Sequence, residues 1–343
     1  MLNRSILAVF ALLTLSAPLP ASAQSQSRDG IAFPDYVEQL KSRARDEGVS
    51  EATIERMTVG LTPNPRVIRL DQGQPGSPTR RGYPALAPYL KTHVNSTRIG
   101  SGRSVYRGHS GILRAIEAEY GVPGEIVVAI FGHETSYGNI RGNFDLSRSL
   151  ATLAWEGRRR QLFADEFIAL MKVADKGYSR DQLIGSYAGA FGNPQFLPSV
   201  YLRLATDGDG DGRADIFTNR PDTFASIANY FRDAGWRSGQ PWGVRARVPN
   251  GFDTEAHSSE LNAQVCPRVH ERHSQWKTVD EWRDLGVEQL GNLRGDTLVS
   301  LFQPDGPGAP AWLLTGNYRV ILEYNCSNYY AMSVGLLADE IVN

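Results

Sequence analysis

One long apolar run with a carboxylate near its end reads Pro123-Gly124-Glu125-Ile126-Val127-Val128-Ala129-Ile130-Phe131-Gly132-His133-Glu134-Thr135-Ser136-Tyr137-Gly138. Proline suits the first position of a helix and glycine suits its end, so the run predicts one helix between Pro123 and Gly138. On a period of 3.6 residues, Ile126, Ile130 and Glu134 lie on one face of that helix. We therefore expect the helix to carry a carboxylate on its buried stripe.

A carboxylate on a buried stripe should bind its proton more tightly than a surface glutamate does. Burying an ionised carboxylate without partners is unfavourable, so the pKa of such a group rises. A carboxylic acid that is still protonated near neutral pH is what a glycosidase uses to protonate a leaving oxygen. The alternative is structural: Glu134 is a glutamate at a helix end, capped or paired with an arginine. The stripe alone favours this structural interpretation.

The first residues predict a secretory signal peptide, residues 1–23. Arg4 precedes an apolar stretch from Ile6 to Leu15, and the small residues Ala21-Ser22-Ala23 precede Gln24. The apolar stretch is too short to span a bilayer, and there is no cysteine near the cleavage point to carry a lipid. We therefore expect a soluble, exported protein without a membrane anchor.

The composition excludes some classes of function and predicts a disulfide. The chain has 343 residues, of which 41% are hydrophobic and 10% aromatic, which suffices for a large core and for more than one lobe. A net charge of -1 gives no indication of a nucleic-acid or anionic membrane partner. Cys266 and Cys326 are the two cysteines of an exported chain, so we expect them to be joined. Two free buried thiols are the alternative.

Helical periodicity dominates most of the chain and changes near its end. The pattern predicts a helical pair between residues 30 and 60, and then helices over 111–120, 125–137, 159–174, 180–188 and 223–234. Residues 61–84 are rich in proline and glycine and predict a connector. Strands are predicted over 297–302, 311–314 and 318–324, followed by a closing helix over 330–341. The expected class is mainly α, with a small β-containing part.

Several segments match one family in a consistent order. They are the run with Glu134, then Ser149-Leu150-Ala151-Thr152-Leu153-Ala154 leading to Arg158-Arg159-Arg160, then Ser186-Tyr187-Ala188-Gly189-Ala190-Phe191-Gly192-Asn193-Pro194-Gln195-Phe196-Leu197-Pro198-Ser199, and finally Tyr324-Asn325 with Tyr329-Tyr330-Ala331-Met332. From about residue 33 to the C-terminus the chain resembles the lytic murein transglycosylase B family, glycoside hydrolase family 103.

The resemblance implies a goose-lysozyme-like, mainly helical fold with a small β-containing lobe. It divides the chain into an N-terminal helical region with a connector (24–105), a lysozyme-like catalytic core (106–245), and a β-containing lobe with a closing helix that completes the site (246–343). It implies a bacterial periplasmic enzyme that cuts the β-1,4 bond between N-acetylmuramic acid and N-acetylglucosamine and releases 1,6-anhydromuropeptides. The chemistry needs no cofactor. The implied partners are peptidoglycan glycan strands, with cell-wall synthases as a second class.

The resemblance also implies roles for individual residues. The family's single catalytic acid/base corresponds to Glu134, its active-site serine to Ser186, and the glutamine of its Gly-x-x-Gln-Phe-x-Pro-Ser turn to Gln195. We expect Ser186 to bond the N-acetyl group and the sugar hydroxyls, and Gln195 to hold the saccharide near Glu134. Without the resemblance, Ser186 would be a helix-interior serine and Gln195 part of a turn.

Five further residues are implied to bind substrate. The tyrosine-asparagine pair and the following tyrosine correspond to Tyr324, Asn325 and Tyr330. A tyrosine offers a sugar ring an apolar face and a hydroxyl, and the asparagine is a hydrogen-bonding candidate. The substrate-contacting arginines fall within 158–160, and we take Arg159 and Arg160, whose guanidinium groups suit peptide carboxylates. The structural alternatives are core tyrosines, a turn asparagine and a solvated helix start.

A separate motif resembles the front of a calcium loop. Asp207, Asp209, Asp211 and Asp215 stand at positions 1, 3, 5 and 9 of such a loop, and a glycine stands at position 6. Thr218 occupies position 12, where a bidentate carboxylate is expected. Some relatives bind calcium in a loop of this kind. The loop is therefore either a weak structural calcium site or an acidic turn without an ion.

Two other functions stay open on the sequence. A lysozyme-type muramidase would hydrolyse the same bond, and a second carboxylate about 5 Å or more from Glu134 across the cleft would favour it. A catalytically idle peptidoglycan-binding protein is the other, against which the retention of Glu134, Ser186, Gln195 and Asn325 argues.

Overall fold

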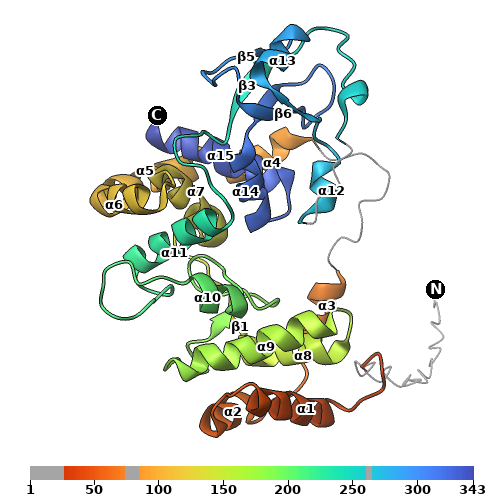
Figure 1. Ribbon diagram of the computed structural model, residues 1–343. Coiled ribbons are helices and arrows are strands. Elements are labelled where there is room, and N and C mark those ends of the chain that lie inside the picture. Colours follow the sequence, from red (N-terminus) through yellow and green to blue (C-terminus); the bar gives the residue numbers. More distant parts are fainter. Residues whose placement is uncertain (1–26, 74–84, 260–264) are drawn as a thin grey trace, which may run out of the picture.

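The computed structural model describes residues 27–73, 85–259 and 265–343 (Figure 1). The predicted signal peptide, residues 1–23, lies outside the described residues. The helices are α1 (Phe33–Asp46), α2 (Glu51–Thr58), α3 (Pro65–Gln72), α4 (Leu86–His93), α5 (Ser96–Gly108), α6 (Ser110–Tyr120), α7 (Gly124–Thr135), α8 (Leu146–Glu156), α9 (Arg160–Asp175), α10 (Pro198–Leu204), α11 (Arg220–Asp233), α12 (Pro267–His270), α13 (Val279–Asp284), α14 (Gly316–Tyr324) and α15 (Asn328–Val342).

The strands are short, and most of them belong to one lobe. They are β1 (Phe144–Asp145), β2 (Ile184–Gly185), β3 (Gly243–Arg247), β4 (Trp276–Thr278), β5 (Glu288–Gln289), β6 (Leu298–Phe302) and β7 (Ala311–Leu314). Five of them form an antiparallel sheet in the order β4-β6-β7-β3-β5, at the top of Figure 1. The mainly helical class with a small β lobe is confirmed.

The buried apolar side chains of the described residues form three clusters. The first contains residues of α6, α7, α11, α14 and α15, the second contains residues of α1, α2, α3, α8, α9 and α10, and the third lies in the β lobe around Trp282. Tyr230 and Tyr324 are partly buried and pack against both helical clusters. The two helical cores therefore meet at these two tyrosines.

Helix α7 lies in the middle of the first cluster. It contains the predicted apolar run, and its side chains from Ile126 to Phe131 are buried on all sides. A helix that is apolar all round is stable in water where other elements cover every face. Here α5, α6, α11 and α15 pack against it. Of the helices in the described part of the chain, none combines the length and apolar composition that a bilayer-crossing segment needs.

Two of the predicted elements are wrong, and the predicted connector also contains a helix. Residues 180–188 form turns and β2 instead of a helix, because Gly185 approaches the backbone of Ala190 and pairs with Phe144 of β1. Residues 318–324 belong to helix α14 instead of a strand, because the side chain of Thr315 caps its start. The expected connector over 61–84 contains α3, which begins at a proline.

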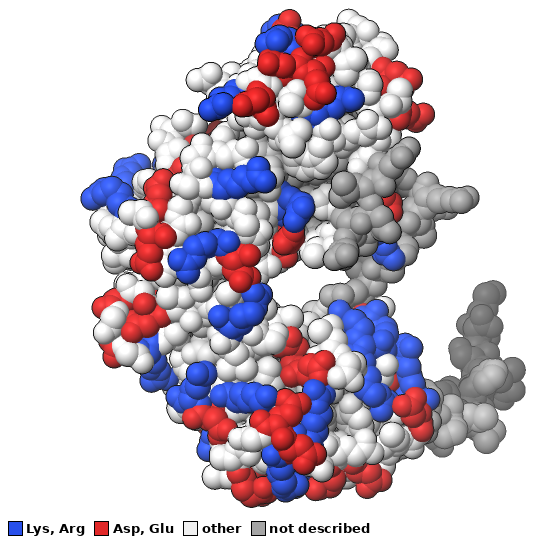
Figure 2. Space-filling view, viewed as in Figure 1, with Lys and Arg blue, Asp and Glu red and all other residues white. Residues whose placement is uncertain are grey.

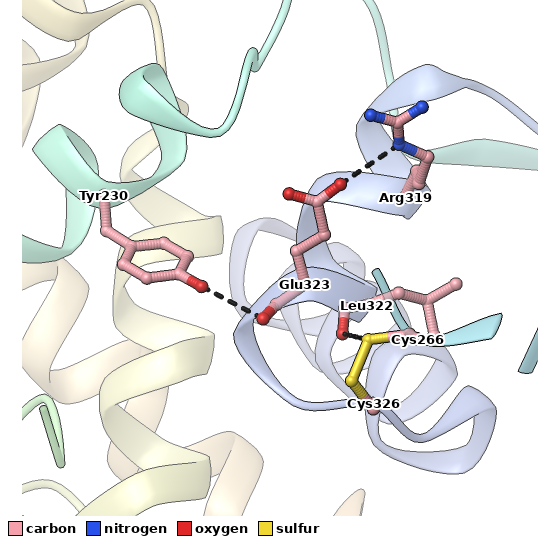
Figure 3. Close-up of a disulfide and its surroundings, with 6 residues drawn as sticks. All are labelled: Tyr230, Cys266, Arg319, Leu322, Glu323 and Cys326. Carbon is pink, nitrogen blue, oxygen red and sulfur yellow. Dashed lines mark hydrogen bonds and ion pairs between the residues drawn. A yellow bond between two sulfur atoms is a disulfide. The ribbon is translucent and has the colours of Figure 1, made fainter. Parts of the chain in front are cut away.

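The predicted disulfide between Cys266 and Cys326 is confirmed. It joins the residue before α12 to the segment between α14 and α15, 60 residues further along the chain. Figure 3 shows the bridge beside Leu322 of α14, and shows the hydroxyl of Tyr230 donating to the carbonyl of Glu323 at 3.0 Å. The bridge therefore fastens the β lobe to the two C-terminal helices.

Replacing both cysteines with alanine should lower the free energy of unfolding. A closed loop of this length corresponds to about 4 kcal/mol in the chain-entropy model, which is an upper expectation. Urea denaturation of the oxidised wild type and the double variant measures the difference, and wild type kept reduced is the control that should match the variant. An unchanged unfolding midpoint would contradict a stabilising bridge.

Candidate active site

Glu134 is near the C-terminal end of α7 and accepts a hydrogen bond from α15. The hydroxyl of Tyr330 donates to its Oε1 at 2.5 Å. Burial raises the pKa of Glu134 from its usual 4.5 to about 7, and the hydrogen bond from Tyr330 opposes part of that rise. A large share of the molecules therefore carries a protonated Glu134 at neutral pH. The raised pKa agrees with the position of Glu134 on a buried stripe.

The neighbouring His133 adds no positive charge to this environment. Its Nδ1 lies 3.0 Å from the carbonyl oxygen of Ala129, so this nitrogen carries the proton. Its Nε2 lies 2.7 Å from the hydroxyl of Ser333, which is also 2.8 Å from the carbonyl of Tyr330. Burial lowers the pKa of His133 to about 3, so the ring is neutral near neutral pH. A charged imidazolium beside Glu134 would favour the carboxylate, and the neutral ring does not.

Two further tyrosines are close enough to sense the charge of Glu134. Burial and then the charge of Glu134 raise the pKa of Tyr324. Burial also raises the pKa of Tyr89; Ser333 and Arg98 oppose this rise, and the charge of Glu134 adds a smaller contribution to it. Tyr324 donates to the carbonyl of Pro194 at 2.6 Å, and its ring centroid is 4.7 Å from that of Tyr230. Sequence reasoning missed Tyr89, which stands alone in a short helix, α4, with no motif to mark it.

The predicted Ser186 and Gln195 stand at the two ends of one compact turn. Ser186 Oγ accepts from the backbone N–H of Ala190 at 2.9 Å. Gln195 has a φ of 53°, and its side-chain amide donates to the carbonyl of Gly192 at 2.8 Å. The hydroxyl of Tyr324 donates to the carbonyl of Pro194, the residue before Gln195. Asn325 follows directly as the residue that ends α14.

The backbone turns sharply just after Glu134. Ser136 and Tyr137 have φ values of 49° and 61°. Residues other than glycine rarely adopt this left-handed backbone conformation. The Tyr137 ring folds back across α7 at Gly132, where a Cβ atom would come within 2.6 Å of it. Its hydroxyl donates to the carbonyl of Arg98 at 2.8 Å. Strained backbone of this kind persists where surrounding contacts hold it.

The predicted arginines are paired with carboxylates. Arg158 Nε donates to Asp71 at 2.7 Å, and Arg159 Nη2 donates to the other oxygen of Asp71 at 2.5 Å. Arg160 pairs with Asp29 at 3.0 Å and lies over the ring of Tyr36. The Asp71 side chain is 2% exposed, and both arginines lower its pKa against the opposing effect of burial. Sequence reasoning missed Asp71, since it lies in the stretch expected to be a connector.

These arginines stand at the start of α9. Figure 2 shows a deep notch between the part that contains α14 and α15 and the part that contains α8 and α9. Basic side chains gather on its lower rim, near α3 and the start of α9. Guanidinium groups on a rim suit a ligand that carries carboxylates.

The structure brings three of the four predicted calcium ligands together. Carboxylate oxygens of Asp207, Asp209 and Asp211 all lie within 4.8 Å of one another, and such a group can hold a metal ion. Asp215 instead accepts from the backbone N–H of Phe217 at 2.8 Å and from the hydroxyl of Thr218 at 2.6 Å. Asp215 lies outside this group of three, and its part in calcium binding stays a prediction.

A carboxylate that the sequence reasoning missed closes this acidic loop. Asp222, on α11, is fully buried and accepts from the backbone N–H of Gly208 at 2.8 Å and of Asp215 at 2.6 Å. Burial raises its pKa. The loop 207–215 is thus folded back onto the start of α11.

Known proteins resemble this chain over most of its length. A model of the Transglycosylase SLT domain matches residues 32–339. The membrane-bound lytic murein transglycosylase B of Escherichia coli K12 is 31% identical over 289 residues, which cover 80% of this chain and 73% of that protein. SltB3 from Pseudomonas aeruginosa, crystallised with NAG-anhNAM-pentapeptide, has a TM-score of 0.82 and 35% identity over 92% of this chain and 80% of that one. A lytic transglycosylase of Escherichia coli crystallised with calcium has a TM-score of 0.74 and 25% identity over 92% and 95%.

Replacing Glu134 with glutamine should make the stability less dependent on pH. The pKa of Glu134 is raised in the folded state, so the folded protein binds more protons than the unfolded chain between pH 4.5 and about 7. The stability that this proton contributes is complete below the unfolded pKa and is lost as the pH rises through the folded pKa. As the pH rises through this window, the free energy of unfolding of the variant should therefore increase relative to that of the wild type, by on the order of 1–3 kcal/mol.

Urea denaturation of both proteins at several pH values across this window measures the gain. Glu55→Gln, at an exposed position of α2, is the control for a generic amide substitution. A difference between wild type and Glu134→Gln that does not change with pH would contradict the raised pKa.

Proposed function

The chain belongs to the lytic murein transglycosylase B family, and on that basis we propose that Glu134 is the single acid/base of its reaction on peptidoglycan. The protein is a lytic transglycosylase. The observation that carries the role of Glu134 is its partly buried carboxyl group, with a pKa near 7 and a hydrogen bond from Tyr330. A group that is half protonated near the working pH can both give and take a proton.

The reaction uses the same carboxyl group twice. Protonated Glu134 gives its proton to the glycosidic oxygen as the bond from that oxygen to C1 of the muramyl residue breaks. The N-acetyl carbonyl oxygen of the muramyl residue shields the cationic C1, which makes a second enzymic carboxylate unnecessary. The carboxylate of Glu134 then takes the proton of the C6 hydroxyl as its oxygen bonds to C1. A 1,6-anhydro ring forms, and Glu134 is protonated again without water being consumed.

The surroundings of Glu134 support internal attack over hydrolysis. Its pKa is set by burial and by Tyr330, with no contribution from another carboxylate of the described residues. A hydrolase with two carboxylates places them close enough to work on one bond, where each would shift the pKa of the other. The muramidase alternative therefore has less support.

The remaining residues would bind and orient the glycan. Ser186 and Asn325 would hydrogen-bond the N-acetyl group and the sugar hydroxyls, and Gln195 would hold the saccharide near Glu134. Tyr324 and Tyr330 offer ring faces beside Glu134, and Tyr330 also tunes its pKa. Arg159 and Arg160 would face the peptide carboxylates of the substrate. SltB3 was crystallised with NAG-anhNAM-pentapeptide and with NAG-NAM-pentapeptide, which supports a substrate of this kind.

We further propose that this protein works in the periplasm on peptidoglycan glycan strands. The signal-peptide pattern of residues 1–23 supports export, and the disulfide supports an oxidising compartment. One relative is described as soluble and another as membrane-bound. Cell-wall synthases are a second class of partner.

Glu134→Gln should abolish turnover while the fold is kept. The amide cannot donate the needed proton, and loss of a general acid/base costs at least ~10²-fold to 10⁴-fold. In the wild type, the rate at low substrate should fall as the pH rises above about 7, because Glu134 loses its proton there. Mass spectrometry of muropeptides released from purified sacculi measures both effects.

The same experiment distinguishes the rival functions. Glu125→Gln, on the same helix, is the matched control and should release anhydromuropeptides at the wild-type rate. Products heavier by the mass of one water would identify a hydrolase. Activity of the Glu134→Gln variant would show that Glu134 is not the acid. A wild type without activity would favour a peptidoglycan-binding protein that does not cut the glycan.

We also propose that the acidic loop holds a structural calcium ion. Three carboxylates with converging oxygens are a donor set that suits a hard cation, and a relative was crystallised with calcium. Backbone N–H groups, that of Gly212 first, lower the pKa of Asp207, which keeps this ligand ionised. Asp207, Asp209 and Asp211 would hold the ion, and Thr218 supplies no carboxylate. The ion would stabilise the fold and take no part in the chemistry.

Calcium should raise the melting temperature and leave the rate at low temperature nearly unchanged, because a ligand of the folded state stabilises it by mass action. Calorimetry and thermal unfolding with calcium and with a chelator measure this. Asp211→Asn should weaken the effect, and Asp253→Asn, on a distant acidic turn, should not. The absence of any heat of binding would mean that the loop is an acidic turn.

A further inference from the structure

The residue that follows Glu134 begins a chain of hydrogen bonds that runs from the buried core to the exposed acidic loop. The hydroxyl of Thr135 shares its one proton between the carbonyl oxygen of Asn193, at 3.2 Å, and that of Phe131 in its own helix, at 3.3 Å. The side-chain amide of Asn193 donates to the hydroxyl of Thr223 at 3.1 Å, and that hydroxyl donates to the carbonyl oxygen of Asn219 at 2.7 Å. The side-chain amide of Asn219 donates to Asp209 at 2.8 Å. The donors all point the same way, away from the catalytic helix.

The inner bonds of this chain are shielded from water. The Thr223 hydroxyl both accepts and donates, so its two bonds strengthen each other, whereas Asn193 and Asn219 each accept with the backbone carbonyl and donate with the side-chain amide. Thr135 and Thr223 are fully buried and Asn193 is 3% exposed, so water does not compete for these bonds. The chain joins the end of α7 to the start of α11 through the turn that carries Gln195.

Hydrogen bonds from two helices hold two neighbouring carbonyl groups of that turn. Thr135 of α7 holds the carbonyl of Asn193, and Tyr324 of α14 holds the carbonyl of Pro194. The next residue is Gln195, whose φ of 53° needs support from its surroundings. Thr135 also accepts from the backbone N–H of Gly138 at 3.1 Å, so one hydroxyl fixes both the turn and the strained segment after Glu134.

We propose that Thr135 and Asn193 are positioning residues that fix Gln195, and the saccharide it holds, relative to the carboxyl group of Glu134. The proposal rests on the proposed function of this site. Both side chains are buried and act through the backbone of the turn, so they do not touch the substrate. A small misplacement of reacting groups, on the order of 1 Å, can cost about 100-fold in rate, so a fixed distance between helix and turn matters to turnover.

The test compares Thr135→Val with Thr135→Ser. Valine keeps the shape and removes the hydroxyl, while serine keeps the hydroxyl. We expect Thr135→Val to lower kcat about 10-fold to 100-fold with KM changed less than about 3-fold, and Thr135→Ser to restore most of kcat. Rates are measured on purified sacculi well below the melting temperature of each variant.

A matched control separates positioning from general loss of stability. Thr58 is buried in α2, and its hydroxyl donates to the carbonyl of Ile54 at 2.7 Å, far along the chain from the site. Thr58→Val should lower the melting temperature without lowering kcat. Wild-type kcat in a folded Thr135→Val, or an equal loss of kcat in Thr58→Val, would overturn the proposal. An inactive wild type would instead overturn the proposed function.

Discussion

A carboxyl group at the end of a helix that is buried on every side is costly to ionise, and the arrangement of the site depends on this constraint. Helix α7 is stable because four other helices cover it, and their cover leaves Glu134 only partly in contact with water. The hydrogen bond from Tyr330 offsets part of the cost of ionising Glu134. The neighbouring His133 is neutral and supplies no positive charge that would offset more of it. The proton affinity of Glu134 is therefore a result of packing, and any element that packs on α7 takes part in setting it.

The site is also the place where two hydrophobic cores meet. Glu134 belongs to a helix of the first core, whereas the turn with Gln195 follows Phe191, which lies in the second. Tyr230 and Tyr324 pack against both cores, and Tyr324 binds the turn directly. The proposed acid/base and the glutamine proposed to hold the substrate thus come from different parts of the protein. Their relative position is set by a small number of contacts between the cores.

The sequence predicted those parts of the fold that local pattern determines. The run ending at Glu134 is apolar enough to indicate its own burial, and the two cysteines left one pairing. Periodicity predicted the wrong structure for segment 180–188. The close approach of Gly185 to Ala190 determines the structure there, and such a contact leaves no periodic pattern in the sequence. Helix α14 has the β-branched and aromatic residues of a strand, but its cap and its packing favour a helix. Asp71, Tyr89 and Asp222 were missed for a related reason: each is a single residue whose partner lies elsewhere in the chain.

The position of the disulfide affects how the protein is best produced. Cys326 directly follows Asn325, so the covalent link secures one wall of the site and closes only where thiols are oxidised. A chain made in a reducing cytoplasm lacks this link, and its β lobe is joined to the C-terminal helices by non-covalent contacts alone. Recombinant material from that compartment is a different species from protein made where the disulfide forms, and its purification needs an oxidation step before the two are compared.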